Sequence, residues 1–254
     1  MEKKVLNPFV QESEGRRYDL YRPHYHDIPC SLLKTELPKI KDALALDVAC
    51  GTGHSTISLS RIVQHVIGVD LSPVMLAEAK KRSGLEFIQA PAEDLPFPDH
   101  HFDLVHVSMA IQWFDQVRFL NEARRLLKMT GYLSLDNYGF TGQMRNQPEF
   151  SHHYKKFDQT YLPPAPRNKN YPDEEMMESH GFRLYRKLPY EHEVEMSAHQ
   201  FSQYLMTRSN FLQIPFQEQA DIASQVESFY EKLFFGQNQK LIFSGILKIY
   251  EVKA

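Results

Sequence analysis

The sequence predicts an α/β fold in which a mostly parallel sheet is covered by helices on both faces. From about residue 43 to residue 138, apolar segments of strand length alternate with segments of helical periodicity. A glycine-containing turn follows the first apolar segment, and an aspartate ends the second. This alternation is typical of a parallel sheet whose strands are joined by crossover helices.

The first two strands and the turn between them form a Rossmann-like unit. Residues 43–49 (ALALDVA) predict a buried strand that ends at the turn Cys50–Gly53, and a helix should begin near Ser55. A second strand over residues 66–69 ends at Asp70. Ser72 and Pro73 then predict an N-cap and a first helical position, for a helix that reaches about Arg82.

The following elements complete the predicted core. Strands are expected over Glu86–Gln89 and Phe102–Ser108, separated by a proline-broken acidic loop over residues 91–101. Asp115 can cap the next helix, and Gly131 should end it before a strand over residues 132–136. The inner side of this helix should carry Val117, Leu120, Ala123 and Leu127.

The alternation lapses after Tyr138. Residues 139–181 are polar and contain prolines, which favours an insertion or lid. A strand over residues 182–194, helices over 198–211 and 217–235, and a last strand over 239–252 should follow. We therefore expect an N-terminal cap (1–40), a binding core (41–138), and a lid with C-terminal strands (139–254) that belongs to the same domain.

Composition narrows the functional classes. The 254 residues are 42% hydrophobic and 24% charged, without an apolar run long enough for a membrane span and without a secretory h-region. We expect a cytoplasmic protein that acts without a membrane. The net charge of −3 offers no general basic field for nucleic acid, and the basic clusters 80–82 and 124–125 are interpreted as solvated helix faces. Cys30 and Cys50 lack metal-ligand spacing, so neither a disulfide nor a metal site is expected.

The turn after the first strand is the main candidate for a binding site. Gly51 and Gly53 allow close backbone approach and positive φ, and Asp70 lies 19 residues after Gly51, near the spacing at which an acidic side chain binds ribose hydroxyls. Both a nicotinamide dinucleotide and S-adenosylmethionine carry such a ribose. A dinucleotide loop needs GxGxxG, whereas this loop reads GTGHST, so the missing third glycine favours S-adenosylmethionine.

Five separated segments carry a family resemblance. LDVACGTG (46–53) and GVDLS (68–72) resemble motifs I and II of class I methyltransferases; AEDLPF (92–97), FDLV (102–105) and residues 126–131 resemble later segments of type-11 methyltransferase domains. The resemblance implies a seven-stranded sheet and S-adenosylmethionine as the cofactor. It assigns to the cofactor Asp47, Ala49, Gly51, Thr52, Gly53, Asp70, Leu71, Ala92, Glu93 and Ser108. Pro91 departs from the family pattern, in which an acidic residue often precedes the alanine.

Two further segments resemble a narrower branch that includes trans-aconitate methyltransferase. They are YDLYRP (18–23), followed by Tyr25, and MAIQWFD (109–115). In that branch Tyr18 and Arg22 would reach the cofactor, although these tyrosines could equally pack an amphipathic helix. The branch commonly has histidine before the tryptophan, and here this position is Gln112, which cannot act as a base.

The absence of that base favours a carboxylate acceptor, which needs no deprotonation. His24, His26 and His54 are alternative bases, and Tyr18, Gln112 and Trp113 are catalytic candidates. Trp113, Tyr204 and Arg208 are candidates for substrate binding. The sequence therefore predicts an enzyme, monomeric or homodimeric, that methylates a small molecule such as a carboxylic acid. A quinone-like or other lipophilic acceptor and a non-catalytic cofactor-binding regulator are the alternatives.

Overall fold

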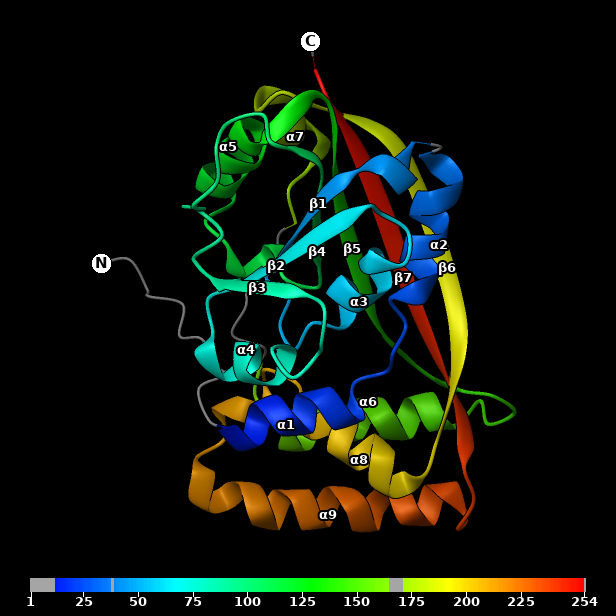
Figure 1. The fold of residues 1–254 in the computed structure, drawn as a ribbon. Helices are drawn as coiled ribbons and strands as arrows, with labels where there is room; N and C mark the ends of the chain where they lie inside the picture. Colours follow the sequence, from blue (N-terminus) through cyan, green and yellow to red (C-terminus); the bar gives the residue numbers. More distant parts are fainter. Residues whose placement is uncertain (1–11, 38, 165–170, 254) are drawn as a thin grey trace. The chain divides into compact units, whose positions relative to one another are not determined.

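A computed structural model describes residues 12–37, 39–164 and 171–253. Its described strands form a seven-stranded sheet in the order β3-β2-β1-β4-β5-β7-β6 (Figure 1). The strands are β1 (Leu44–Val48), β2 (His65–Asp70), β3 (Glu86–Gln89), β4 (Phe102–Ser108), β5 (Leu127–Met144), β6 (Phe182–Met196) and β7 (Gln239–Val252). The helices are α1 (Glu12–Tyr21), α2 (Asp27–Glu36), α3 (His54–Ser60), α4 (Pro73–Ala79), α5 (Gln116–Leu126), α6 (Phe150–Tyr161), α7 (Glu174–Ser179), α8 (Ala198–Met206) and α9 (Phe216–Phe234).

The order of the strands reverses at β1. The chain runs outward from β1 to β2 and β3, and then returns to place β4 and β5 on the other side of β1. Each of these neighbouring pairs is parallel, so the carboxyl ends of β1 and β4 lie side by side. Ligands of open α/β sheets bind beyond the strand ends at such a reversal. The predicted fold class, including the mostly parallel seven-stranded sheet, is confirmed.

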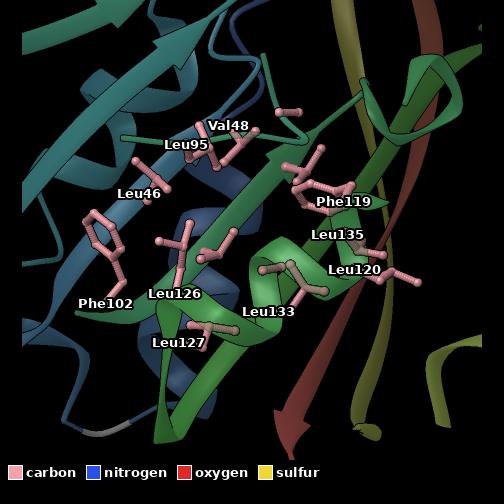
Figure 2. Close-up of a cluster of buried hydrophobic side chains, with 14 of the residues drawn as sticks. Leu46, Val48, Leu95, Phe102, Phe119, Leu120, Leu126, Leu127, Leu133 and Leu135 are labelled. Atoms are coloured by element: carbon pink, nitrogen blue, oxygen red, sulfur yellow. The ribbon is translucent and has the colours of Figure 1, made fainter. Parts of the chain in front are cut away.

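Alternate residues of the central strands are buried on opposite faces of the sheet. Leu46 and Val48 of β1 pack with Leu120 and Leu126 of α5, in the core cluster that Figure 2 shows. Ala45, which points to the other face, belongs to a second cluster with residues of α2 and α3. Both faces are therefore buried under helices, which explains why these strands are continuous apolar runs.

Two predicted helix starts are present. The Ser72 hydroxyl accepts a hydrogen bond from Met75 N at 3.3 Å, and Pro73 is the first residue of α4. The Asp115 carboxylate accepts from Arg118 N at 3.2 Å at the start of α5. Each side chain satisfies an amide that has no partner within its helix.

The region after α5 differs from the prediction. Val117 is 48% exposed instead of facing the core. β5 begins at Leu127, directly after α5, and Gly131 lies at a break in the β4–β5 register, where Leu127 pairs with Phe102 but Tyr132 pairs with Leu104. The strand then continues to Met144, so residues 139–144 extend β5. Polar and glycine residues interrupt the hydrophobic alternation there and conceal the strand.

Residue contacts divide the chain into two compact units. The sheet unit comprises His24–Tyr138, Asn168–Tyr190 and Gly245–Ala254, and the helical unit comprises Met1–Pro23, Gly139–Arg167 and Glu191–Ser244. The helical unit contains α1, α6, α8 and α9, and its interior is strongly aromatic: the rings of Phe201 and Tyr230 meet edge to face with centroids 4.8 Å apart. Among the described residues, no helix combines the length and apolar character needed to cross a membrane.

Candidate functional site

The turn after β1 has the backbone geometry that its glycines predict. Ala49, Gly51 and Gly53 have φ of 57°, 57° and 84°, and Gly53 is the N-cap of α3. A Cβ on Gly53 would lie 2.9 Å from the Phe87 ring, so glycine is required there by both conformation and space. The chain thus turns sharply at the carboxyl end of β1 and presents its backbone at the strand reversal.

The Asp70 carboxylate is hydrogen-bonded to the backbone of this turn. Its Oδ2 accepts a hydrogen bond from Gly51 N at 2.8 Å, and its Oδ1 accepts from Ser72 N at 2.7 Å. Burial raises the pKa of the Asp70 carboxyl, and these amide hydrogen bonds oppose the rise. Each carboxylate oxygen has a second lone pair, so the group can still accept hydrogen bonds from a ligand. The neighbouring Leu71 is 56% exposed, which is unusual for a leucine beside a buried strand end.

Asp47 is buried beneath the turn. Its Oδ2 accepts hydrogen bonds from the Ser55 and Thr56 hydroxyls, both at 2.6 Å. Burial raises the pKa of the Asp47 carboxyl to about 7, although those two hydrogen bonds oppose the change. Within the described residues, Asp47 Oδ1 and the buried Thr52 Oγ1 have no hydrogen-bond partner. Unpaired buried oxygens beside a glycine turn fit a polar ligand such as the predicted cofactor, because such groups otherwise carry a desolvation cost.

The end of β4 and the middle of β5 carry a second polar network that the sequence did not reveal. Ser108 Oγ donates to Asp136 Oδ2 at 3.1 Å and lies 2.8 Å from the Tyr25 hydroxyl, while the Tyr190 hydroxyl donates to Asp136 Oδ1 at 2.7 Å. Burial raises the pKa of Asp136 to about 6. A Cβ on Gly245 would lie 2.3 Å from Tyr190, so a glycine in β7 leaves room for the tyrosine of β6 beside it.

This network fixes the start of α2. The Tyr25 ring stacks on the Tyr138 ring, with centroids 3.5 Å apart. The adjacent His24 ring contacts the ring of His54, the first residue of α3, edge to face with centroids 4.0 Å apart. Burial and the nearby His54, His106 and His24 lower the pKa of His26 well below its usual value. The three histidines considered as bases therefore lie beside the glycine turn, within the sheet unit.

Gln112 is held at both ends of its amide. Its Nε2 donates to Met109 O at 2.7 Å, and its Oε1 accepts from the Tyr171 hydroxyl at 3.1 Å. Met109 itself has a φ of 58°, directly after β4. Trp113 is half-buried and packs against the core cluster that contains α5. Gln112 thus shapes the loop after β4 and offers no basic atom.

The loop after β3 is attached to α5. Ala92 is buried, and Glu93 Oε1 accepts from Asp115 N at 2.9 Å. Arg125 donates to Leu95 O at 3.1 Å and to Phe97 O at 2.8 Å. The sequence interpretation of residues 124–125 as a solvated face was therefore incomplete, since Arg125 fastens the loop.

Four predicted site residues belong to the helical unit. Arg22 donates to Thr207 O at 3.1 Å, and its guanidinium lies 4.9 Å from the Tyr18 ring centroid and 5.3 Å from that of Tyr204. Arg208 forms an ion pair with Asp158 and donates to the Tyr154 hydroxyl at 2.9 Å. Tyr204 is buried. The assignment of these residues to cofactor or substrate stays a prediction.

Comparison with known proteins agrees with this geometry. Residues 46–135 match the family described as "Methyltransferase domain". A putative methyltransferase from Dictyostelium discoideum is 30% identical over 166 residues, which cover 64% of this chain and 62% of that protein. A demethylmenaquinone methyltransferase from Staphylococcus carnosus is 40% identical over 36% of this chain and 41% of its own length. A malonyl-[acyl-carrier protein] O-methyltransferase from Enterobacter lignolyticus is 34% identical over 51% and 55%, respectively.

Among solved structures, a putative type II methyltransferase from Anaeromyxobacter dehalogenans has a TM-score of 0.69 at 22% identity, covering 91% of this chain and 97% of that one. This likeness extends the shared fold beyond the matched segment. The chain spans 41–62% of the length of the three curated relatives above. Residues 46–135 thus resemble a methyltransferase domain.

Proposed function

We propose that this protein is an S-adenosylmethionine-dependent methyltransferase that acts on a small molecule. The observation that carries the proposal is the pairing of the Gly51–Gly53 turn with the Asp70 carboxylate, which lies 2.8 Å from Gly51 N at the strand reversal. An adenosine ribose suits this pair. The loop lacks the third glycine of a phosphate-binding turn, and the match of residues 46–135 to methyltransferase domains supports the sulfonium cofactor.

S-adenosylmethionine supplies an activated methyl group, and the protein contributes binding, orientation and exclusion of water. We assign the methionine end to Asp47, Ala49 and the backbone of residues 51–53. Asp47 and Thr52 carry the unpaired buried oxygens of this segment. Asp70 accepts hydrogen bonds from the ribose hydroxyls, and exposed Leu71 contacts the adenine. Cofactor roles for Ala92, Glu93, Ser108, Tyr18 and Arg22 rest on the family resemblance.

A carboxylate is the acceptor that the loop after β4 favours. Gln112 uses both ends of its amide within the protein and has no basic atom. A carboxylic acid is already ionised at neutral pH and requires no base. The malonyl-[acyl-carrier protein] O-methyltransferase relative supports this class. Our candidates for substrate binding remain Trp113, Tyr204 and Arg208. The charge of Arg208 is compensated by its ion pair with Asp158.

A quinone-like acceptor is the second candidate, and the demethylmenaquinone methyltransferase relative favours it. The tail also supplies aromatic residues such as Phe201 and Phe211, which are buried in the helical unit. A regulatory protein that binds the cofactor without turnover is the third. We propose that the protein acts in the cytoplasm as a monomer or homodimer, with residues 1–40 as a cap over the cofactor. Residues 1–11 and 38 of this cap lie outside the described part of the chain.

The test is formation of S-adenosylhomocysteine, measured by mass spectrometry, with separate panels of small di- and tricarboxylic acids and of reduced quinones. Turnover with an acid, together with a base-labile methyl ester product, supports the carboxylate proposal. Turnover with quinols alone selects the second candidate. Calorimetric binding of S-adenosylmethionine without turnover in either panel selects the regulator, and absence of binding overturns the cofactor assignment.

A further inference from the structure

Arg82 differs from its neighbours in the basic cluster that follows α4. The sequence favoured a solvated face for residues 80–82, and Lys81 is indeed exposed and pairs with Glu78 of α4. Arg82 is half-buried, and its Nε donates a hydrogen bond to the Thr52 carbonyl at 2.7 Å. The two residues are 30 positions apart in the chain, so this contact joins the segment after α4 to the glycine turn.

The glycine turn is therefore held from both ends of α4. Asp70, before the helix, accepts from Gly51 N, and Arg82, after it, donates to Thr52 O. Fixing the Thr52 carbonyl also fixes the plane of the Thr52–Gly53 peptide, since the peptide bond is planar. The Gly53 N–H of that same peptide donates to Cys50 O at 2.9 Å. The orientation of two peptides in the turn thus depends on residues that flank α4.

The arginine stem adds packing to this hydrogen bond. A Cβ on Gly53 would lie 3.3 Å from Arg82 Cδ, so the methylene groups lie directly against the turn. The guanidinium also lies 3.4 Å from Nδ1 and 3.5 Å from Nε2 of His54, the first residue of α3. The planar guanidinium can reach the Thr52 carbonyl and the His54 ring at the same time, because its donors lie on separate nitrogen atoms. A lysine ammonium group carries all its donors on one atom.

We propose that Arg82 is a positioning residue for the cofactor, because it holds the Thr52 carbonyl and thereby keeps the Gly51–Gly53 turn in its binding conformation. This inference rests on the proposed function, in which that turn binds the methionine end of S-adenosylmethionine. A preorganised turn binds its ligand without the cost of ordering glycine-rich backbone. Loss of Arg82 lets the turn sample other conformations, and cofactor binding then has to restore the bound one.

The experiment compares Arg82→Ala, Arg82→Lys and the matched control Lys81→Ala. Calorimetric titration with S-adenosylmethionine should show affinity about tenfold weaker in Arg82→Ala, the ratio expected for one hydrogen bond from a charged donor, with partial recovery in Arg82→Lys. Lys81→Ala should bind as the unaltered protein does. Hydrogen exchange of the ligand-free protein should be faster over residues 50–57 in Arg82→Ala and unchanged in Lys81→Ala.

Two further readouts separate positioning from general destabilisation. Low millimolar guanidinium chloride should restore binding in Arg82→Ala, since the ion replaces the lost group, and should leave Lys81→Ala unaffected. Any measured turnover should show a raised KM for the cofactor with kcat nearly unchanged. Unaltered affinity and exchange in both Arg82 variants would overturn the inference while the parent protein still binds. If the parent protein fails to bind S-adenosylmethionine, the proposed function fails, and exchange over residues 50–57 still decides whether Arg82 orders the turn.

Discussion

Asp70 has two tasks at the same oxygens, because it orders the turn after β1 and, in our proposal, binds the ribose. Asp70→Ala removes both, and we expect cofactor affinity to fall by about 2–3 kcal/mol, or roughly 30- to 150-fold. Asp70→Asn keeps an acceptor for one amide and should lose less. Calorimetry with S-adenosylmethionine measures the loss. Asp42→Ala, at an exposed position before β1, is the control. If Asp70→Ala bound the cofactor as tightly as the unaltered protein does, Asp70 would not bind the ribose.

Asp47 makes stability depend on pH with a defined sign. The unfolded carboxyl loses its proton near pH 3.8, whereas burial raises the pKa of the folded one to about 7. Between these values the folded state binds more protons, so the free energy of unfolding falls as pH rises from about 4 to about 7 and is level above. Asp47→Asn removes this contribution.

The expected size of that effect follows from the shift of about three pKa units, which corresponds to roughly 4 kcal/mol. Urea denaturation at several pH values should therefore show a shallower decline between pH 4 and pH 7 in Asp47→Asn, whose amide oxygen can still accept from Ser55 and Thr56. Asp42→Asn should keep the parent slope. A parent protein whose stability is constant over this range would show that Asp47 is ionised when folded.

Arg125 acts at the scale of an element, because it fastens the loop after β3 to α5. Its nitrogens donate to two loop carbonyls, at Leu95 and Phe97, and to the carboxylates of Glu122 and Asp99. A lysine has three donors on one atom and cannot span these acceptors. In Arg125→Lys, we expect faster hydrogen exchange over residues 91–101 and cofactor affinity reduced severalfold.

The matched control for this prediction is Arg118→Lys, on an exposed position of the same helix. Hydrogen exchange with mass spectrometry resolves the loop, and calorimetry gives the affinity. Exchange in Arg125→Lys that equals the control would mean that the loop is held by its other contacts, such as the Glu93 hydrogen bond to Asp115 N.

The elements differ in how well the sequence predicts them, and the reasons are physical. β3 and β4 are found at their predicted bounds. β4 is buried along most of its length and is largely apolar, as expected for a central parallel strand, whereas β3 is a short edge strand with exposed ends. β5 runs eight residues beyond the predicted Asp136, since Asn137, Gly139 and Gly142 interrupt its pattern while its backbone continues the ladder. Local composition thus locates strand centres better than strand ends.

The residues of the candidate site also differ in how well the sequence predicts them. The Gly51–Asp70 pair was predictable because positive φ and a fixed spacing leave a local signature. Arg82 and Arg125 were interpreted as solvated, because their partners are backbone carbonyls distant in the chain and any residue provides a carbonyl. Asp136 was missed because its partners Ser108 and Tyr190 come from two other strands and the tyrosine needs the space beside Gly245.

At the scale of the whole molecule, three strands connect the sheet unit with the helical unit. β5 crosses the boundary at residues 138–139, β6 at 190–191 and β7 at 244–245, each without a break in the strand. Each of these three strands therefore belongs in part to one unit and in part to the other. We therefore expect the described chain to unfold as one cooperative system, despite its division by contacts.

Phe201→Leu tests this cooperativity, because it perturbs one unit while the probe lies in the other. Phe201 is fully buried in the aromatic interior of the helical unit, and the substitution should cost on the order of 1 kcal/mol. Trp113, the single tryptophan of the sequence, lies in the sheet unit and makes fluorescence a local probe there. The Trp113 and far-UV circular dichroism midpoints should both fall by about 2–4 °C, whereas Gln225→Ala, at an exposed position of α9, should leave both unchanged. A fall seen only by circular dichroism would mean that the helical unit unfolds on its own, and that strand continuity does not transmit its stability to the cofactor turn.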